Sequence, residues 1–421
     1  MAYVEGRLVY DADSHIHEPP GYAERYADPD IRARLAERLE AFRKPPGVEE
    51  AIAKQHDPEF RARDAEEILL RKNSLAVGAV IAEDRVQALD LLGFGAQLVF
   101  TTTYLDPLRE FDVNAEVEMA YAMARAHNRG MVDFCSVDPR LLPVCYVPFA
   151  DVDRAVDMTR EAIEMGAAAL KIASHPPRHH SPSHVGLDRV WAQAQEAGVP
   201  VVFHVGGEQP MNPVYKNNGL PPVPDFHGGD TNFTSVSYMA IPYAPMQTLS
   251  TLIIDGVLDR FPQLRIGVIE LGAAWLPGLM RSMDSAAEAF RRNEERLQKL
   301  SLLPSEFVRR QVRVTPYPHE PAGWIVENSG VEIPMFSSDY PHVEGGRNPV
   351  KRFDASLAGC GEEITSAFYA GNFADLMGPT LVRQRPRPDT QLRLSATQSP
   401  LPMEELGGLR RTRQLDGPTT P

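Results

Sequence analysis

Residues 141–205 contain two complete strand–helix units and read LLPVCYVPFADVDRAVDMTREAIEMGAAALKIASHPPRHHSPSHVGLDRVWAQAQEAGVPVVFHV. The runs LPVCYV, AALKIA and VPVVFHV are short and apolar, as is typical of buried strands. Between the first two, DVDRAVDMTREAIEMG places its apolar residues on one helical face and ends at Gly166, which suits a helix C-terminus. LDRVWAQAQEAG separates the second run from the third in the same way. This alternation predicts parallel strands joined by crossover helices.

The same alternation continues over most of the chain. Eight apolar runs are strand candidates: RLVYDA, AQLVFTT, LPVCYV, AALKIA, VPVVFHV, LRIGVIE, VRVT and IPMFSS. Eight strands with helices between them, in a chain of 421 residues, predict an α/β fold of the (β/α)8 TIM-type barrel class. An open, doubly wound sheet is the alternative, but no GxGxxG or GxxxxGK[ST] loop follows any of these strands.

Two segments fall outside the strand–helix alternation. Residues from about 20 to 86 are charged and helix-prone, and the segment is too long for a simple barrel loop. We expect it to be a helical insertion after the first strand, near the barrel mouth. Near Arg385 the composition shifts to proline, glycine and polar residues with little periodicity. We therefore assign residues 1–383 to the barrel and predict a disordered tail over residues 384–421.

Composition narrows the class of partner and the compartment. Lys and Arg number 43 against 57 Asp and Glu, and the net charge of −14 argues against nucleic acid or an anionic membrane as a partner. A small-molecule substrate is the expectation. The three cysteines lie far apart, so they form neither a CxxC metal motif nor a disulfide framework. No apolar run approaches the length of a membrane span, and the N-terminus does not read as a signal peptide. We expect a soluble, cytoplasmic protein.

Titratable residues follow several of the predicted strands directly. In TIM barrels the active site lies at the carboxyl ends of the strands, so such residues should converge on one mouth. They are Asp13 and His15 on the first strand, His204 on the fifth, Glu270 on the sixth and Asp339 on the eighth. The DxH spacing fits a strand, because residues two apart point to the same side. A mixed set of nitrogen and oxygen donors without thiolates suits Zn²⁺, Mn²⁺ or Fe²⁺.

Four motifs, in this order along the chain, resemble the amidohydrolase-2 branch of the amidohydrolase superfamily: DADSH, VVFHVGG, DGVLDRFPQLRIGVIELGAAW and MFSSDYPH. The decarboxylases of aminocarboxymuconate semialdehyde and of γ-resorcylate belong to that branch. The resemblance covers most of the chain to about residue 380. It implies a distorted (β/α)8 barrel that binds one divalent ion, with Zn²⁺ expected and Mn²⁺ or Fe²⁺ as alternatives. The implied ligands are Asp13, His15, His204 and Asp339, and a homodimer is implied as well.

The chain departs from the pattern of this branch at two points. The first ligand pair can also be read as HxH, with His15 and His17. We prefer Asp13 with His15, because the first strand aligns best that way and Glu18 follows as it does in branch members. In the decarboxylases the sixth strand ends in a His, whereas this chain has Glu270. This carboxylate could serve as a further ligand or as a general base.

The function expected from the resemblance is metal-dependent hydrolase or lyase chemistry. Nonoxidative decarboxylation of a carboxylated small organic acid is the first expectation, with Glu270, Asp339 and His204 as catalytic residues. Metal-dependent hydrolysis of a lactone, an amide or another cyclic substrate is the alternative. A non-catalytic barrel that acts as a binding or scaffold protein is the second alternative. Four more residues are expected to contact substrate or to support the ligands: His17, Glu18, Lys171 and His342.

Overall fold

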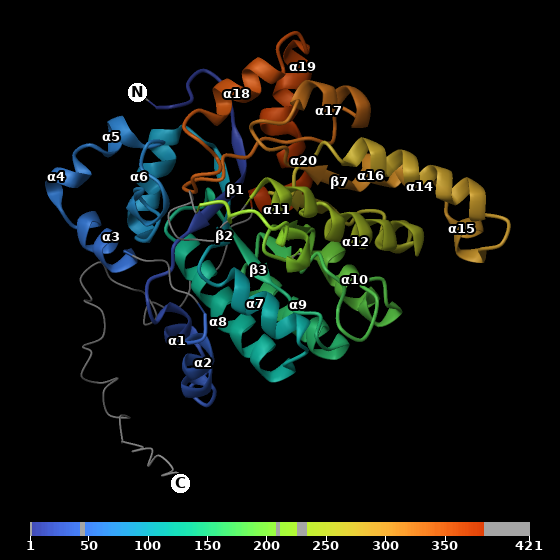
Figure 1. Cartoon of the computed structure of the whole chain (residues 1–421), viewed down its shortest axis with the longest axis horizontal. Helices are drawn as coiled ribbons and strands as arrows, with labels where there is room; N and C mark the ends of the chain where they lie inside the picture. The colour runs from blue at the N-terminus through green and yellow to red at the C-terminus, as the bar shows by residue number, and fades with distance from the viewer. Residues whose placement is uncertain (1, 43–46, 208–210, 225–233, 383–421) are drawn as a thin grey trace. The chain divides into compact units, whose positions relative to one another are not determined.

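Parallel strands form the centre of the molecule, with helices outside them (Figure 1). The computed structural model describes residues 2–42, 47–207, 211–224 and 234–382. Within these ranges seven strands pair in chain order, each with the next. Their bounds are β1 (Tyr10–Ile16), β2 (Ala96–Thr101), β3 (Leu141–Tyr146), β4 (Ala169–Lys171), β5 (Val201–His204), β6 (Ile266–Ile269) and β7 (Val312–Val314).

The eighth predicted strand, within residues 333–340, joins the two edges of this sheet. On one side Val314 N donates to Ile333 O at 3.0 Å and Met335 N donates to Val314 O at 2.9 Å. On the other side Asp339 N donates to Asp13 O at 3.0 Å, and Ser14 bridges in parallel to Tyr340. The segment is too irregular to count as a full strand, yet it pairs with both β7 and β1. The barrel prediction is therefore confirmed, and the open-sheet alternative is wrong.

Helix α9 (Val152–Met165) begins and ends where the sequence pattern predicts. The Asp151 carboxylate accepts a hydrogen bond from Arg154 N at the start of α9, and Gly166 ends that helix with φ of 105°. Both are features that the sequence pattern indicated. The helices from α6 onward are α6 (Ala82–Leu92), α7 (Leu105–Val113), α8 (Val117–Cys135), α9 (Val152–Met165), α10 (Asp188–Ala197), α11 (Ser235–Ala240), α12 (Tyr243–Ile254), α13 (Val257–Arg260), α14 (Leu276–Phe290), α15 (Glu295–Lys299), α16 (Pro304–Gln311), α17 (Ala322–Ser329), α18 (Pro349–Ser356), α19 (Gly361–Ser366) and α20 (Asn372–Met377).

Between β1 and α6 the chain forms the predicted helical insertion, which lies on the left in Figure 1. Its helices are α1 (Tyr22–Tyr26), α2 (Arg32–Leu39), α3 (Val48–Gln55), α4 (Pro58–Arg61) and α5 (Asp64–Glu67). Backbone bonds tie it to the barrel, because His17 N donates to Ala79 O at 2.8 Å and Asn73 N donates to Pro341 O at 2.9 Å. The insertion therefore packs against the carboxyl ends of β1 and of the closing segment.

The described residues all belong to one compact unit, Met1–Pro388. The tail predicted over residues 384–421 lies outside them. In the part of the chain that the structure describes, no helix combines the length and the apolar character that a membrane crossing requires.

Tyr340 provides a test of how the insertion supports the barrel closure. Its side chain is 1% exposed and its Oη donates to Val77 O at 2.7 Å. We expect Tyr340→Phe to lower the free energy of unfolding by about 1–2 kcal/mol, because the buried Val77 carbonyl loses its partner. Urea unfolding of the metal-free protein measures this, with Tyr215→Phe, at a side chain that is 74% exposed, as the control. Equal stabilities for the two variants would contradict the expectation.

Candidate metal centre

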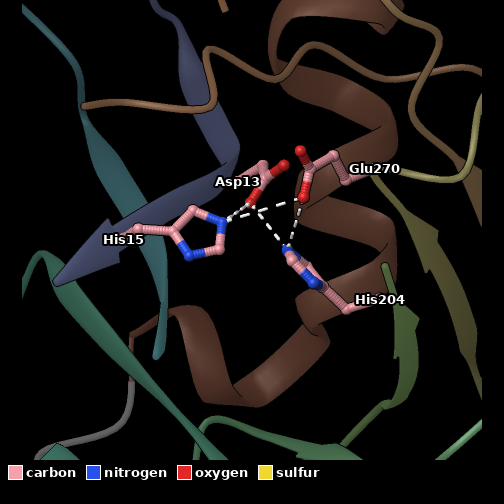
Figure 2. A group of neighbouring side chains, drawn as sticks. All are labelled: Asp13, His15, His204 and Glu270. Atoms are coloured by element: carbon pink, nitrogen blue, oxygen red, sulfur yellow. Dashed lines mark hydrogen bonds and ion pairs between the residues drawn. The ribbon is translucent and has the colours of Figure 1, made fainter. Parts of the chain in front are cut away.

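Four side chains from three strands converge at the carboxyl end of the barrel (Figure 2). One ligating atom from each of Asp13, His15, His204 and Glu270 lies within 4.8 Å of the others. Asp13 Oδ1 is 3.1 Å from His15 Nε2 and 3.2 Å from His204 Nε2. Glu270 Oε2 is 3.3 Å from His204 Nε2. Figure 2 shows both carboxylates turned toward the two imidazole rings, so the four groups face one common point.

Asp339 lies next to the same cluster. Its Oδ1 is 3.7 Å from His15 Nε2, and His15, Asp339 and His342 form a second group with metal-binding spacing. All five residues predicted at the strand ends therefore meet at one mouth. Neither group includes His17, so among the described residues the geometry supports the pairing of Asp13 with His15 over the HxH register.

Backbone geometry places each of these side chains. Asp13 and His15 alternate along β1, and His204 is the last residue of β5. Glu270 directly follows β6 with φ of 53°, and Asp339 has φ of 52°. This left-handed region is uncommon for residues other than glycine and costs on the order of 1 kcal/mol at each position. Such strain is typical of functional sites.

Both imidazoles are oriented by backbone carbonyls. His15 Nδ1 lies 3.1 Å from Thr101 O, and His204 Nδ1 lies 2.8 Å from Val205 O. A carbonyl only accepts, so each Nδ1 carries the proton and each Nε2 presents its lone pair to the cluster. Burial lowers the pKa of His15 and of His204 well below the usual range, and nearby positive charge adds to the effect. Both rings are therefore neutral, which is the form that binds metal ions.

Unsatisfied buried atoms at the cluster fit a divalent ion. Asp13 Oδ2, His15 Nε2 and Asp339 Oδ2 make no hydrogen bond among the described residues. A buried carboxylate oxygen without a partner costs free energy, and a cation would remove that cost. Two imidazole nitrogens with carboxylate oxygens are donors that Zn²⁺, Mn²⁺ and Fe²⁺ accept. The residues present therefore fit the ion that the sequence predicted.

Two predicted supporting residues connect the ligands to β2. The Glu18 carboxylate accepts from Thr101 Oγ1 and, at 3.0 Å, from Thr103 N, which joins the ends of β1 and β2. His342 Nδ1 lies 2.9 Å from Asp339 Oδ1, and its Nε2 lies 2.9 Å from Thr102 Oγ1. Burial lowers the pKa of His342, but the adjacent Asp339 outweighs this and brings it to about 9.

The other two predicted supporting residues, Lys171 and His17, lie close to the cluster. Lys171 ends β4, is 4% exposed and contributes positive charge that helps to lower the pKa of His204, after burial. The His17 ring lies edge-on to His342 at 5.4 Å between centroids. Within the described ranges neither nitrogen of the His17 ring has a hydrogen-bond partner.

Tyr317 also lies at the site, although the residue pattern did not single it out. A small pocket opens beside the cluster, and its lining includes Asp13, Glu270 and Asp339 together with Tyr317. The Tyr317 Oη donates to Glu270 O at 2.6 Å, which fixes the backbone of that residue. One signal could have identified this tyrosine, because it lies three residues beyond the end of β7, where barrel side chains reach the mouth.

Metal content tests the ligand assignment. We expect Asp13→Asn/His204→Gln to weaken Mn²⁺ or Zn²⁺ binding by more than the roughly 10- to 100-fold that the loss of an outer partner costs. Equilibrium dialysis followed by elemental analysis measures this. The matched control is Asp112→Asn/His127→Gln, a buried pair of the same residue types outside both ligand groups. Equal loss of metal in the two variants, or retention in both, would contradict the assignment.

Comparison with solved structures shows what this fold resembles. The amidohydrolase map2389c from Mycobacterium avium subsp. paratuberculosis K-10 is 22% identical, with a TM-score of 0.66 over 89% of this chain and 99% of that one. The 5-carboxyvanillate decarboxylase LigW from Sphingomonas paucimobilis is 16% identical, with a TM-score of 0.58 over 88% and 99%. The 5-carboxyvanillate decarboxylase from Novosphingobium aromaticivorans DSM 12444, in complex with manganese and 4-hydroxy-3-methoxy-5-nitrobenzoic acid, is 19% identical, with a TM-score of 0.58 over 88% and 96%.

At these sequence identities the similarity to solved structures shows the fold alone. A comparison with curated proteins found no match to the chain. The family model described as Amidohydrolase (Amidohydro_2) matches residues 12–376, which reach from β1 to α20 and include every residue of both ligand groups. The resemblance seen in the sequence motifs is thereby confirmed, and the chain belongs to this amidohydrolase family.

Proposed function

We propose that this protein catalyses the metal-dependent, nonoxidative decarboxylation of a carboxylated small organic acid. The observation that carries the proposal is the pocket in which Asp13, Glu270 and Asp339 face the same space. This arrangement offers a cation site for an anionic substrate and a carboxyl group beside it that can carry a proton. Two of the solved structures with this fold are decarboxylases of a carboxylated aromatic acid, which supports the choice of reaction.

The reaction sets two requirements. The substrate carboxylate leaves as CO2, the electron pair of the broken C–C bond stays on the substrate carbon, and that carbon takes a proton. The ion would be held by Asp13, His15, His204 and Asp339. When bound, it supplies a Lewis acid that fixes the anionic substrate and draws electron density from it. The protein must then provide a proton donor next to the carbon.

Glu270 is the best placed proton donor. It lines the pocket, and its Oε2 is 3.3 Å from His204 Nε2 at the edge of the ligand cluster. A protonated Glu270 also reduces the negative charge that an anionic substrate would meet, since Asp13 and Asp339 already contribute two carboxylates. Glu270 gives its proton to the substrate carbon and becomes a carboxylate, and an ion held by Asp13, His15, His204 and Asp339 would supply positive charge that stabilises this carboxylate.

Other residues orient the acids and limit water. Asp339 is held by His342, which in turn contacts Thr102 Oγ1. Tyr317 holds the Glu270 backbone and lines the pocket between Pro316 and Pro318. These apolar and aromatic surfaces displace water from the reacting carbon, which strengthens the electrostatic interactions in the pocket.

Metal-dependent hydrolysis of a lactone, an amide or another cyclic substrate is the second candidate. Glu270 favours it, because a carboxylate beside a metal site suits a general base that activates water. The two reactions differ in their products. Hydrolysis adds water to the substrate and releases no CO2.

Turnover in D2O separates the two reactions. We expect the Mn²⁺- or Zn²⁺-loaded protein to release CO2 from at least one member of a panel of carboxylated phenols. The product should carry one deuterium at the carbon that lost the carboxylate. Glu270→Gln should lower kcat by about 100-fold or more while metal content is kept, because it removes the proton donor. Glu362→Gln, at an exposed carboxylate of α19, should leave kcat unchanged.

Two other results of this experiment would contradict decarboxylation. Turnover of lactones or amides without CO2 release would replace decarboxylation with hydrolysis. Full metal content without turnover in either panel would favour the binding or scaffold alternative.

A further inference from the structure

A chain of buried hydrogen bonds runs alongside the ligand cluster on the first two strands. Its members are Arg85 on α6, Gln97 on β2 and Asp11 on β1, all 0% exposed. Arg85 Nε donates to Gln97 Oε1 at 3.2 Å, and Gln97 Nε2 donates to Asp11 Oδ2 at 2.7 Å. We refer to these three side chains as the Arg85–Gln97–Asp11 network.

Both ends of the network contact the backbone that carries the metal ligands. Asp11 Oδ1 accepts from Ser338 N at 2.8 Å and from Asp13 N at 3.3 Å, and Asp11 Oδ2 accepts from Ser338 Oγ at 2.6 Å. Arg85 Nη1 donates to His15 O at 3.0 Å. The network thus reaches Asp13 and His15 directly and reaches Asp339 through the preceding residue, Ser338.

The network has a fixed polarity. A guanidinium only donates, and both Asp11 oxygens accept hydrogen bonds from Ser338 or Asp13, so the Gln97 amide turns its oxygen to Arg85 and its nitrogen to Asp11. The opposite rotamer of Gln97 would place its NH2 group against the Arg85 guanidinium, donor against donor, and would remove the donor to Asp11 Oδ2. A buried polar network also costs desolvation that apolar side chains would avoid. Its presence here points to a requirement for exact geometry beyond simple filling of the core.

We propose that Arg85, Gln97 and Asp11 are positioning residues for the metal centre, which hold β1 against the closing segment so that Asp13, His15 and Asp339 face the same ion. The residues act through the backbone and do not touch the ion or the substrate. The proposal rests on the metal centre and is independent of whether the protein decarboxylates or hydrolyses its substrate.

The fixed polarity makes a reversal experiment possible. Gln97→Glu removes the amide donor to Asp11 Oδ2 and places two carboxyl groups face to face, and Asp11→Asn places two amide nitrogens face to face. In the double variant Asp11→Asn/Gln97→Glu, the amide at position 11 donates to the carboxylate at position 97, which also accepts from Arg85. The oxygen at position 11 still accepts from Ser338 N and Asp13 N, and the Ser338 hydroxyl can rotate to accept.

The measurement is the affinity of each variant for Mn²⁺ alone, by competition with a chelator, beside urea unfolding of the metal-free protein. We expect each single variant to bind Mn²⁺ about 10- to 100-fold more weakly and the double variant to regain most of the loss. Asp112→Asn is the control, because this buried carboxylate accepts from Tyr146 Oη at 2.8 Å and from Phe149 N at 2.9 Å and belongs to neither ligand group. It should leave Mn²⁺ affinity unchanged.

Four outcomes would overturn the proposal. The first is single variants that are less stable but bind Mn²⁺ as the unaltered protein does, since the network would then serve the fold alone. The second is a folded double variant that stays as weak as the single variants. The third is no Mn²⁺ binding by the unaltered protein, which would remove the metal centre itself. If a single variant does not fold, Ser338→Ala takes its place, because this substitution deletes only the hydroxyl hydrogen bond to Asp11. Unchanged Mn²⁺ affinity in Ser338→Ala is the fourth outcome.

Discussion

The backbone hydrogen bonds that residues 333–340 make on both sides are the constraint on which the candidate site depends. Met335 pairs with β7 on one side, and Asp339 N donates to Asp13 O on the other. This closure brings a ligand near the start of the chain next to one near its end. Without it Asp339 would lie at a sheet edge, away from β1. The same segment carries Ser338, through which the Arg85–Gln97–Asp11 network contacts the ligand backbone.

Strand periodicity explains why so much of this site could be predicted from the sequence. Alternation along β1 placed Asp13 and His15 on one side, and the position of His204 at the end of β5 followed from its apolar run. The eighth strand was harder, because its residues bond to both neighbours without forming a regular strand. Arg85 could not be found in this way, since its role depends on a side-chain direction that no residue pattern encodes. Tyr317 could have been noticed only from its position shortly after β7. The identity of the metal ion and the homodimer stay predictions.

Negative charge is concentrated in the ligand cluster of the candidate metal centre. Asp13 and Asp339 approach two imidazoles that burial keeps neutral, so these rings do not offset the negative charge of the two carboxylates. Basic groups nearby supply part of the compensating positive charge, among them His342 against Asp339 and Lys171 near His204. A divalent ion would supply the rest. Metal binding is therefore coupled to folding, because an ion that binds only the folded chain stabilises it.

The left-handed backbone at Glu270 and Asp339 sets a limit on how this barrel can be made more robust. Glycine is the residue that such backbone angles favour, so substitutions chosen for thermal tolerance alone would remove both pocket carboxylates early. At these two positions, higher thermal stability and retention of the pocket carboxylates favour different residues. A related chain with glycine at both would be a good candidate for a barrel that has kept its shape and lost its chemistry.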